Sequence, residues 1–205
     1  MNDENKIEKW IAIGDIHASL DPLIQILDQA QSYSDHKLIF LGDYFDYGNE
    51  LCEVLDTLIK IERPAIFLKG NHEEEFLNFY EKYGTNKVKR RKILNYFGIG
   101  VEHIDWLYNY LIYSYSNQNN CFFSHAGIDD LKEVNEQTNY DLIYSAFKEN
   151  LDHVNPKLTF IQGHTIVDSV TCFGNHWLVD TGCGLGGKLS ALVYTYPVMQ
   201  ILSSN

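Results

Sequence analysis

The sequence predicts an α/β protein (α+β by some schemes) in which two packed, mixed β-sheets form a sandwich flanked by helices. Two observations support this fold class. Up to about residue 70, apolar strands alternate with amphipathic helices, which is typical of a parallel sheet with right-handed crossovers. Beyond Tyr110, short apolar strands follow one another closely, which indicates a second sheet packed on the first. A length of 205 residues fits one domain, which we expect to span residues 1–205.

The first part of the chain contains three predicted strands and two predicted helices. The strands are expected at residues 10–13, 38–41 and 65–68. Apolar side chains recur at helical spacing after Ser19 and again from Leu51 to Leu58, and the second helix should stop before Pro64. These elements form a β-α-β-α-β unit. In such a unit, the loops at the carboxyl ends of the strands gather into one crevice.

The rest of the chain is expected to begin with a helical insert and to continue in strands. The insert covers about residues 73–110, with a break near Gly98 and Gly100. Strands are expected at residues 112–115, 121–124, 158–161, 170–173, 177–180 and 190–196, and a helix near 140–150. We expect these later strands to be mainly antiparallel. No repeat or linker divides the chain.

Composition narrows the classes of protein to which the chain can belong. A formal net charge of -12 argues against broad affinity for nucleic acid or for an anionic membrane, since both need many Lys and Arg side chains. No stretch approaches the roughly 20 apolar residues of a membrane span, and residues 1–10 are too polar for a signal peptide. We therefore expect a cytoplasmic protein. The four cysteines have no zinc-site spacing.

Five predicted strands end in a glycine-containing loop that carries Asp, Asn or His. The loops are Gly14-Asp15-Ile16-His17, Gly42-Asp43-Tyr44-Phe45-Asp46-Tyr47-Gly48, Gly70-Asn71-His72-Glu73, Ser124-His125-Ala126-Gly127 and Gln162-Gly163-His164-Thr165. One such Asp is often only a turn residue. Imidazole, carboxylate and amide groups together suit two borderline divalent ions, and Asp43, on the middle strand, is the natural bridging ligand. Two metals can activate water and clamp an in-line displacement at phosphorus, which predicts phosphoester cleavage.

The five ordered motifs resemble those of calcineurin-like metallophosphoesterases. Within them, the resemblance is to the phosphoprotein phosphatase branch, which includes small bacterial and phage serine/threonine phosphatases and symmetrical diadenosine tetraphosphatases. Trp106-Leu107, Asp180-Thr181-Gly182 and Gly186-Gly187-Lys188-Leu189 extend the resemblance over nearly the whole chain. It implies a four-layer α/β/β/α fold and a phosphatase of phosphoprotein (Ser/Thr) or nucleotide substrates.

The resemblance also implies a role for each motif residue. The expected metal ligands are Asp15 and His17 for the first ion, Asp43 as the bridge, and Asn71, His125 and His164 for the second ion. The expected cofactors are two divalent ions, with Mn first and Fe, Zn, Ni or Mg as alternatives. His72 would be the proton donor and would pair with Asp46.

The sequence departs from the family pattern where the substrate phosphate is usually held. Tyr47 stands in the place of an arginine that grips phosphate oxygens, and residues 127–163 contain no arginine in the place of a second. A phenol cannot replace a bidentate cation. Tyr47, Arg90 and Arg91 are therefore the candidate substrate-binding residues. The basic run Lys87–Lys92 is either a solvated helix face or a basic lip over the crevice.

These departures leave two alternatives to a phosphatase. One is a phosphodiesterase, whose substrate carries less charge. The other is a non-catalytic metal-binding module of the same fold. A milder departure is Ala18, in a position that the family fills with glycine.

Overall fold

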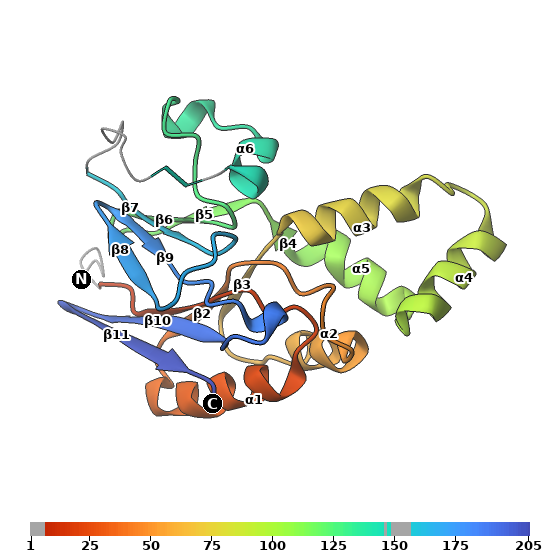
Figure 1. Ribbon diagram of the computed structural model, residues 1–205, viewed down its shortest axis with the longest axis horizontal. Coiled ribbons are helices and arrows are strands. Elements are labelled where there is room, and N and C mark those ends of the chain that lie inside the picture. The colour runs from red at the N-terminus through yellow and green to blue at the C-terminus, as the bar shows by residue number, and fades with distance from the viewer. Residues whose placement is uncertain (1–6, 146, 149–156) are drawn as a thin grey trace, which may run out of the picture.

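The computed structural model describes residues 7–145, 147–148 and 157–205. Two sheets lie face to face in the centre of the molecule, and helices cover both outer faces (Figure 1). The order of the layers is α1 (Leu20–Ala30) with α2 (Leu51–Ile59), sheet A, sheet B, and α6 (Asn139–Tyr144). The predicted sandwich flanked by helices is confirmed.

Sheet A has the strand order β11-β10-β1-β2-β3-β4. Its strands are β1 (Trp10–Ile13), β2 (Lys37–Phe40), β3 (Ala65–Leu68), β4 (Leu111–Ile112), β10 (Ser190–Thr195) and β11 (Val198–Ser203). The first four in chain order pair in parallel, whereas β10 is antiparallel to both β1 and β11. The β-α-β-α-β prediction is confirmed, with β2 beginning one residue early.

Sheet B has the order β5-β6-β7-β9-β8. Its strands are β5 (Ser114–Ser116), β6 (Cys121–Ser124), β7 (Thr159–Gln162), β8 (Thr171–Phe173) and β9 (His176–Leu178). The prediction of mainly antiparallel pairing is wrong here, because β7 is parallel to both β6 and β9. The strand predicted at 190–196 is β10, which belongs to sheet A.

The strand predicted at 112–115 is also wrong, because two short strands occupy this region. β4 ends sheet A at Ile112, and β5 begins sheet B at Ser114. Tyr113 lies between them, and its hydroxyl accepts a hydrogen bond from Lys69 at 3.3 Å and donates one to Glu74 at 3.1 Å. These bonds anchor the chain where it crosses from one sheet to the other.

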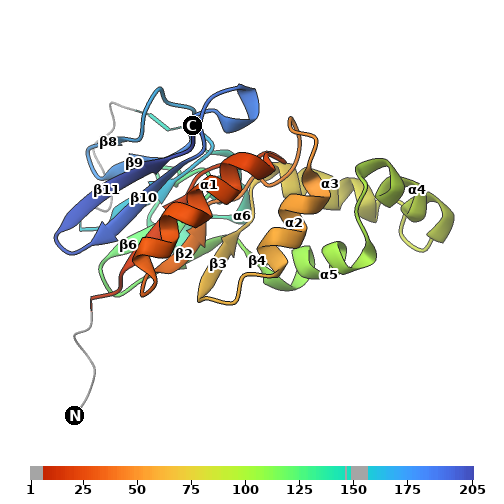
Figure 2. The ribbon, with the colours of Figure 1, turned by 90° about the horizontal axis from the view of Figure 1, so that it is seen from below.

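Strand β1 shows how sheet A is buried on both faces. All four of its side chains are fully buried. Ile11 and Ile13 pack in the cluster beneath α1 and α2, which Figure 2 shows crossing the outer face of sheet A. Trp10 and Ala12 point the other way, into the cluster between the sheets. A third cluster, which includes Leu142 of α6 and Phe160 of β7, covers sheet B.

The segment between β3 and β4 folds into three helices that extend away from the sheets (Figure 1). They are α3 (Asn71–Glu81), α4 (Lys87–Phe97) and α5 (Val101–Tyr110). The break expected near Gly98 separates α4 from α5, and Gly98 has a φ of 68°. The helix expected near 140–150 ends at Tyr144, and residues 149–156 lie outside the described residues.

Across the described ranges, the chain contains no helix with the length and apolar character needed to cross a membrane.

Candidate active site

The loops after β1, β2, β3, β6, β7 and β9 meet at the carboxyl edges of both sheets. They form a cleft of about 280 Å³. Its lining includes five of the six predicted ligands, the predicted proton donor His72, and Asp180: Asp15, His17, Asp43, Asn71, His72, His164 and Asp180. His125 lies directly beneath the cleft and is fully buried. The structure therefore brings together residues that lie up to 165 positions apart in the sequence.

Asp43 lies at the centre of the cleft. Its Oδ2 is 3.3 Å from Nε2 of His125 and 3.8 Å from Nε2 of both His17 and His72. Two groups of potential ligand atoms share this carboxylate, and within each group the atoms lie within 4.8 Å of one another. The groups are His17, Asp43 and His72, and Asp43, His125 and His164.

Two of the histidines are oriented by backbone carbonyls. Nδ1 of His17 donates to the carbonyl of Phe45 at 2.7 Å, and Nδ1 of His125 donates to that of Leu41 at 2.9 Å. In the neutral rings, Nε2 then carries the lone pair that faces Asp43. Oδ1 of Asn71 lies 3.0 Å from Nε2 of His125, on the side of the second group.

Asp15 lines the same cleft but lies outside both groups. Its Oδ2 accepts the backbone N–H of His164 at 3.0 Å, while its buried Oδ1 has no hydrogen-bond partner. Burial, and then the charge of Asp180, raise the pKa of Asp15 well above its ordinary value. A partnerless carboxylate oxygen beside a second buried carboxylate is an arrangement that a bound cation would relieve.

The protonation of the central groups also depends on Asp43. Burial would raise the pKa of Asp43, but the facing histidines, His125 foremost, hold it well below its ordinary value. Burial opposes protonation of His125, yet the charges of Asp43 and Asp15 raise the pKa of His125 to about 10. Burial, and then the charge of His125, lower the pKa of His164 to about 4. An ion bound here would displace a proton from His125.

Glu73 positions the central loop, a role that the sequence analysis missed. Its buried carboxylate accepts four backbone N–H groups. Oε2 accepts from Asp43 and Gly70, each at 2.9 Å, and Oε1 accepts from Tyr44 at 2.7 Å and Phe45 at 3.2 Å. Burial, and then the charge of Asp43, raise the pKa of Glu73 to about 7, and the N–H donors oppose this rise. Glu73 thus ties the start of α3 to the loop that carries Asp43.

Asp180 also lines the cleft, although it is absent from the ligand set that the sequence predicts. Asp180 lies two residues beyond the end of β9, and its Oδ1 accepts the N–H of Gly182 at 2.9 Å. The sequence predicts a strand at 177–180 that would include Asp180, but β9 ends at Leu178. The signal that could have found it is the one used for the other loops, an Asp after an apolar strand and before a glycine.

The loops that carry these groups have an unusual backbone. Among the described residues, six of the seven non-glycine residues with positive φ belong to them: His17, Ala18, Asp43, Asp46, Tyr47 and His164. Such conformations are strained and persist only where surrounding contacts hold them, and they cluster at functional sites. Gly70 and Gly163 admit the close approach of the loops, because a Cβ there would overlap with the carboxylates of Asp43 and Asp15.

The candidate proton donor is held as the sequence predicts. Nδ1 of His72 lies 2.5 Å from Oδ2 of Asp46. Burial opposes protonation, but the Asp46 hydrogen bond and the Asp43 charge raise the pKa of His72. Tyr47 also lines the cleft, with its ring centroid 4.8 Å from that of His17 and 5.5 Å from that of His72.

The structure does not bring Arg90 and Arg91 to the cleft. Both lie on α4, none of whose residues is among those that line it, and Figure 1 shows α4 beyond the far end of α3. The guanidinium of Arg90 lies over the ring of Tyr80, 4.4 Å from its centroid. Of the two interpretations of the basic run, this arrangement favours a helix face remote from the cleft.

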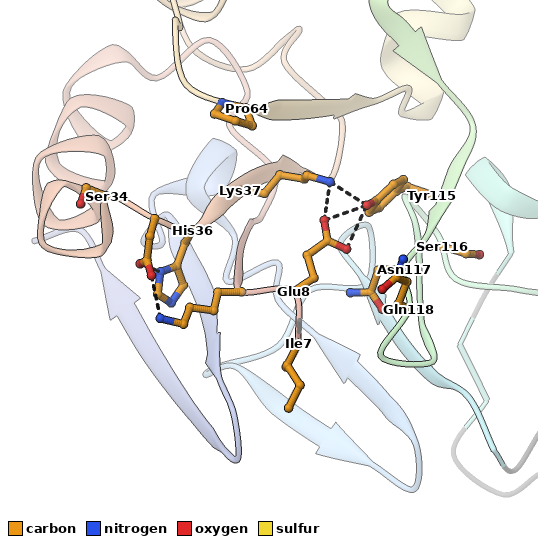
Figure 3. A pocket seen from close by; sticks show the side chains of 12 residues that line it. Ile7, Glu8, Ser34, His36, Lys37, Pro64, Tyr115, Ser116, Asn117 and Gln118 are labelled. Atoms are coloured by element: carbon orange, nitrogen blue, oxygen red, sulfur yellow. Dashed lines mark hydrogen bonds and ion pairs between the residues drawn. The ribbon is translucent and has the colours of Figure 1, made fainter. Parts of the chain in front are cut away.

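A larger cavity of about 980 Å³ lies at the other end of sheet A, beside the residues that precede β1 and β2 (Figure 3). Lys37 pairs with Glu8 and donates to the hydroxyl of Tyr115 at 2.8 Å, and that hydroxyl donates to Glu8 at 2.9 Å. Lys9 pairs with Asp35 at 2.6 Å. These charges neutralise one another, and neither candidate metal group lies there. The smaller cleft is the candidate active site.

Known proteins provide an independent comparison. The family model described as calcineurin-like phosphoesterase matches residues 9–183. The symmetrical bis(5'-nucleosyl)-tetraphosphatase of a Marinomonas species is 33% identical over 120 residues, which cover 57% of this chain and 43% of that relative. The asymmetrical bis(5'-nucleosyl)-tetraphosphatase of Anoxybacillus flavithermus is 24% identical over 93% of this chain and 91% of its own length.

Among solved structures, that of a protein proposed to be a diadenosine tetraphosphatase superimposes with a TM-score of 0.73. The match covers 98% of this chain and 96% of the other, at 18% identity, and so bears on the fold alone. The family match includes all five predicted loops and the Asp180 loop as far as Cys183. This chain therefore belongs to the calcineurin-like phosphoesterase family.

Proposed function

We propose that this protein is a metal-dependent phosphoester hydrolase that acts on nucleotide or phosphoprotein (Ser/Thr) substrates. The observation that carries the proposal is the central position of Asp43. One oxygen of this carboxylate faces Nε2 of three histidines, and it belongs to both candidate metal groups. A carboxylate can bridge two ions, whereas an imidazole normally cannot.

The side chains present fit two divalent ions. We assign Asp15 and His17 to one ion, Asn71, His125 and His164 to the other, and Asp43 to both. The oriented Nε2 atoms and the partnerless Oδ1 of Asp15 support this assignment. Mn is our first choice, and Fe, Zn, Ni or Mg would suit the same nitrogen and oxygen donors. Such a pair supplies Lewis acidity to phosphoryl oxygens and lowers the pKa of water.

His72 would then complete the reaction by protonating the leaving oxygen. Its Nδ1–H is held by Asp46, so the proton available for transfer is on Nε2, which faces the cleft. As the bond between phosphorus and the leaving oxygen breaks, the proton on Nε2 passes to that oxygen and the ring becomes neutral. Asp46 keeps the ring oriented throughout.

We also propose that residues 1–205 act as one domain. The support is that the proposed ligands come from loops of both sheets and are spread along the sequence from Asp15 to His164. Among substrates, nucleotides gain support from the names of the two curated relatives. A phosphodiesterase is the second candidate, because the described residues that line the cleft include no Lys or Arg. It predicts faster turnover of bis(4-nitrophenyl) phosphate than of 4-nitrophenyl phosphate.

The test is hydrolysis of 4-nitrophenyl phosphate by protein loaded with Mn. Asp43→Asn should abolish turnover and lower the bound metal, while Asp28→Asn, at an exposed site on α1, should leave both unchanged. If wild type were inert on monoesters, diesters and dinucleoside polyphosphates, a non-catalytic metal-binding module would replace the hydrolase.

A further inference from the structure

Three exposed apolar side chains surround the mouth of the cleft. Tyr47, Ile166 and Leu185 all line it, and they are 60%, 54% and 65% exposed. They come from three separate loops, after β2, after β7 and after β9. Exposed apolar groups that converge on a site of chemistry are typical of a contact surface for a ligand.

The cleft offers little positive charge with which to sort substrates. Three carboxylates line it, those of Asp15, Asp43 and Asp180, and no Lys or Arg is among the described residues that line it. Two divalent ions would bring four positive charges, and these carboxylates would offset most of them. Additional phosphate groups on a substrate would find few partners in the cleft itself. The cleft must therefore select among substrates through contacts other than those with phosphate groups.

Tyr47 is fixed beside the reacting groups. Its φ of 62° places it in the left-handed region, and its ring stands steeply to the rings of His17 and His72, at 76° and 61°. The ring therefore contacts a proposed metal ligand and the proposed proton donor while more than half of its surface stays open. A phenol ring cannot clamp a phosphate, but it offers a face on which a planar ring can stack.

The other two rim residues are held by loop contacts. Ile166 packs beside Gly182, where an added Cβ would lie 3.4 Å from its Cγ2. Leu185 ends the short helical turn η3 (Cys183–Leu185), and Gly184 of that turn fits closely against the ring of His17. The rim is thus built on the loops that carry the proposed ligands, or is packed against them.

We propose that Tyr47, Ile166 and Leu185 form an apolar rim that selects phosphoesters whose leaving group carries a planar aromatic ring. This inference rests on the proposed hydrolase function. The ring can belong to an aryl alcohol or to a nucleobase, since both present the same flat face. Tyr47 provides the stacking face, and the two aliphatic side chains enclose the ring.

The first test compares leaving groups that differ only in aromaticity. Benzyl phosphate and cyclohexylmethyl phosphate have similar bulk and similar alcohols as leaving groups. Tyr47→Ala should lower kcat/KM for the benzyl ester by at least about fivefold and for the cyclohexylmethyl ester by less than twofold. Tyr47→Phe should retain the preference. Tyr96→Ala, which removes an exposed tyrosine of α4, is the matched control and should change neither.

A second pair separates the two sources of the ring. Adenosine 5'-phosphate and ribose 5-phosphate share the leaving alcohol and differ in the base. If nucleobases occupy the rim, Tyr47→Ala should lower kcat/KM for adenosine 5'-phosphate and leave that for ribose 5-phosphate unchanged. If only the benzyl ester responds, the ring is that of an aryl alcohol. Equal losses of kcat/KM for every ester would contradict the proposed selectivity of the rim and leave the hydrolase proposal intact.

Binding provides a readout that does not depend on turnover. Benzylphosphonate should bind more tightly than ethylphosphonate to the wild type loaded with Mn, by calorimetry, and Tyr47→Ala should remove the difference. Equal affinities in the wild type would overturn the rim. If no ester were hydrolysed but benzylphosphonate still bound more tightly, the proposed hydrolase function would fail and the proposed role of the rim in binding would stand.

Discussion

Nδ1 of His72 lies 2.5 Å from Oδ2 of Asp46, while Nε2 of the same ring lies 3.8 Å from Oδ2 of Asp43. The first contact orients the ring and the second directs its other nitrogen into the cleft. The ring also belongs to one of the two candidate metal groups. His72 could therefore act as a proton donor or as a metal ligand, and the two roles predict different effects of its substitution on turnover and on metal content.

As a proton donor, His72 should matter most for leaving groups that depart poorly as anions. We expect His72→Asn to lower kcat for benzyl phosphate by about 10²- to 10⁴-fold. The loss should be far smaller for 4-nitrophenyl phosphate, because nitrophenolate departs without a proton. Steady-state kinetics on the two esters measure the difference. Metal content should stay at the wild-type value, and a loss of bound metal would instead make His72 a ligand.

The Asp15 carboxylate should destabilise the metal-free protein and strengthen metal binding. Asp15→Asn should stabilise the metal-free protein, because it removes a buried charge near Asp180 while its amide oxygen can still accept from His164. Mn at 100 times its Kd should stabilise the wild type by about 2.7 kcal/mol, and the variant by much less. Thermal unfolding with Mn and with a chelator measures both effects. If Mn stabilised the wild type and Asp15→Asn equally, the assignment of Asp15 as a metal ligand would be contradicted.

Glu73 should be essential for folding of the central loop. In Glu73→Gln, the amide nitrogen cannot accept, so about two of the four N–H groups lose their partner. We expect a loss on the order of 2 to 5 kcal/mol in the free energy of unfolding, measured with urea. Glu75→Gln, at an exposed position on the same helix, should stay within about 0.5 kcal/mol. Similar losses for the two variants would contradict this role.

A contact between α2 and α5 should make stability depend on pH. Asp56 accepts from Nε2 of His103 at 3.1 Å, and this bond lowers the pKa of Asp56. Because the folded-state pKa lies below the unfolded value of about 3.9, the contact stabilises above that pH and is lost as the pH falls through the folded-state value.

Asp56→Asn should consequently cost less than about 1 kcal/mol at pH 7, since the carboxylate is half exposed. The difference from wild type should shrink at pH 3. Urea unfolding at the two pH values measures it. A difference that grows toward low pH would be evidence against the contact.

Ala18 occupies a backbone conformation that favours glycine, with a φ of 50°. Glycine would relieve about 1 to 2 kcal/mol of strain. It would also lose a buried methyl, worth about 0.8 kcal/mol, and gain unfolded-state entropy worth about 0.4 to 1 kcal/mol. Ala18→Gly should therefore change the free energy of unfolding by less than about 1 kcal/mol. Ala18→Val should destabilise by about 2 kcal/mol or more, because β-branching is incompatible with this φ.

The sequence predicted the loops that meet at the cleft because their signal is local. An apolar strand followed by glycine and a ligating residue can be recognised without knowing the fold, and parallel strands bring such loops to one edge. Glu73 escaped this reasoning because its partners are backbone N–H groups of Asp43, Tyr44 and Phe45, about 30 positions away. A glutamate at the start of a helix does not by itself indicate that role.

Strand pairing in the second half was harder to predict, for a similar reason. Periodicity shows that β7 and β10 are strands, but it does not show which sheet each one joins. The break at Tyr113 lies in the stretch Tyr110–Tyr115, where Ser114 is the one residue that is neither apolar nor aromatic, so the change of sheet leaves little local sign. The remoteness of Arg90 and Arg91 depends on the lengths and directions of three helices, which composition does not reveal.

The pairing of β1 has a consequence for synthesis of the protein. This early strand lies between β2 and β10, so one of its edges stays open until residues 190–195 have been made. Domains tend to fold from the amino end as they emerge from the ribosome, but pairing between distant segments is slow. The nascent chain thus leaves this edge of β1, beside Asp15, unpaired until β10 has been synthesised. A chaperone that binds extended apolar segments would protect this edge of β1 until β10 pairs with it.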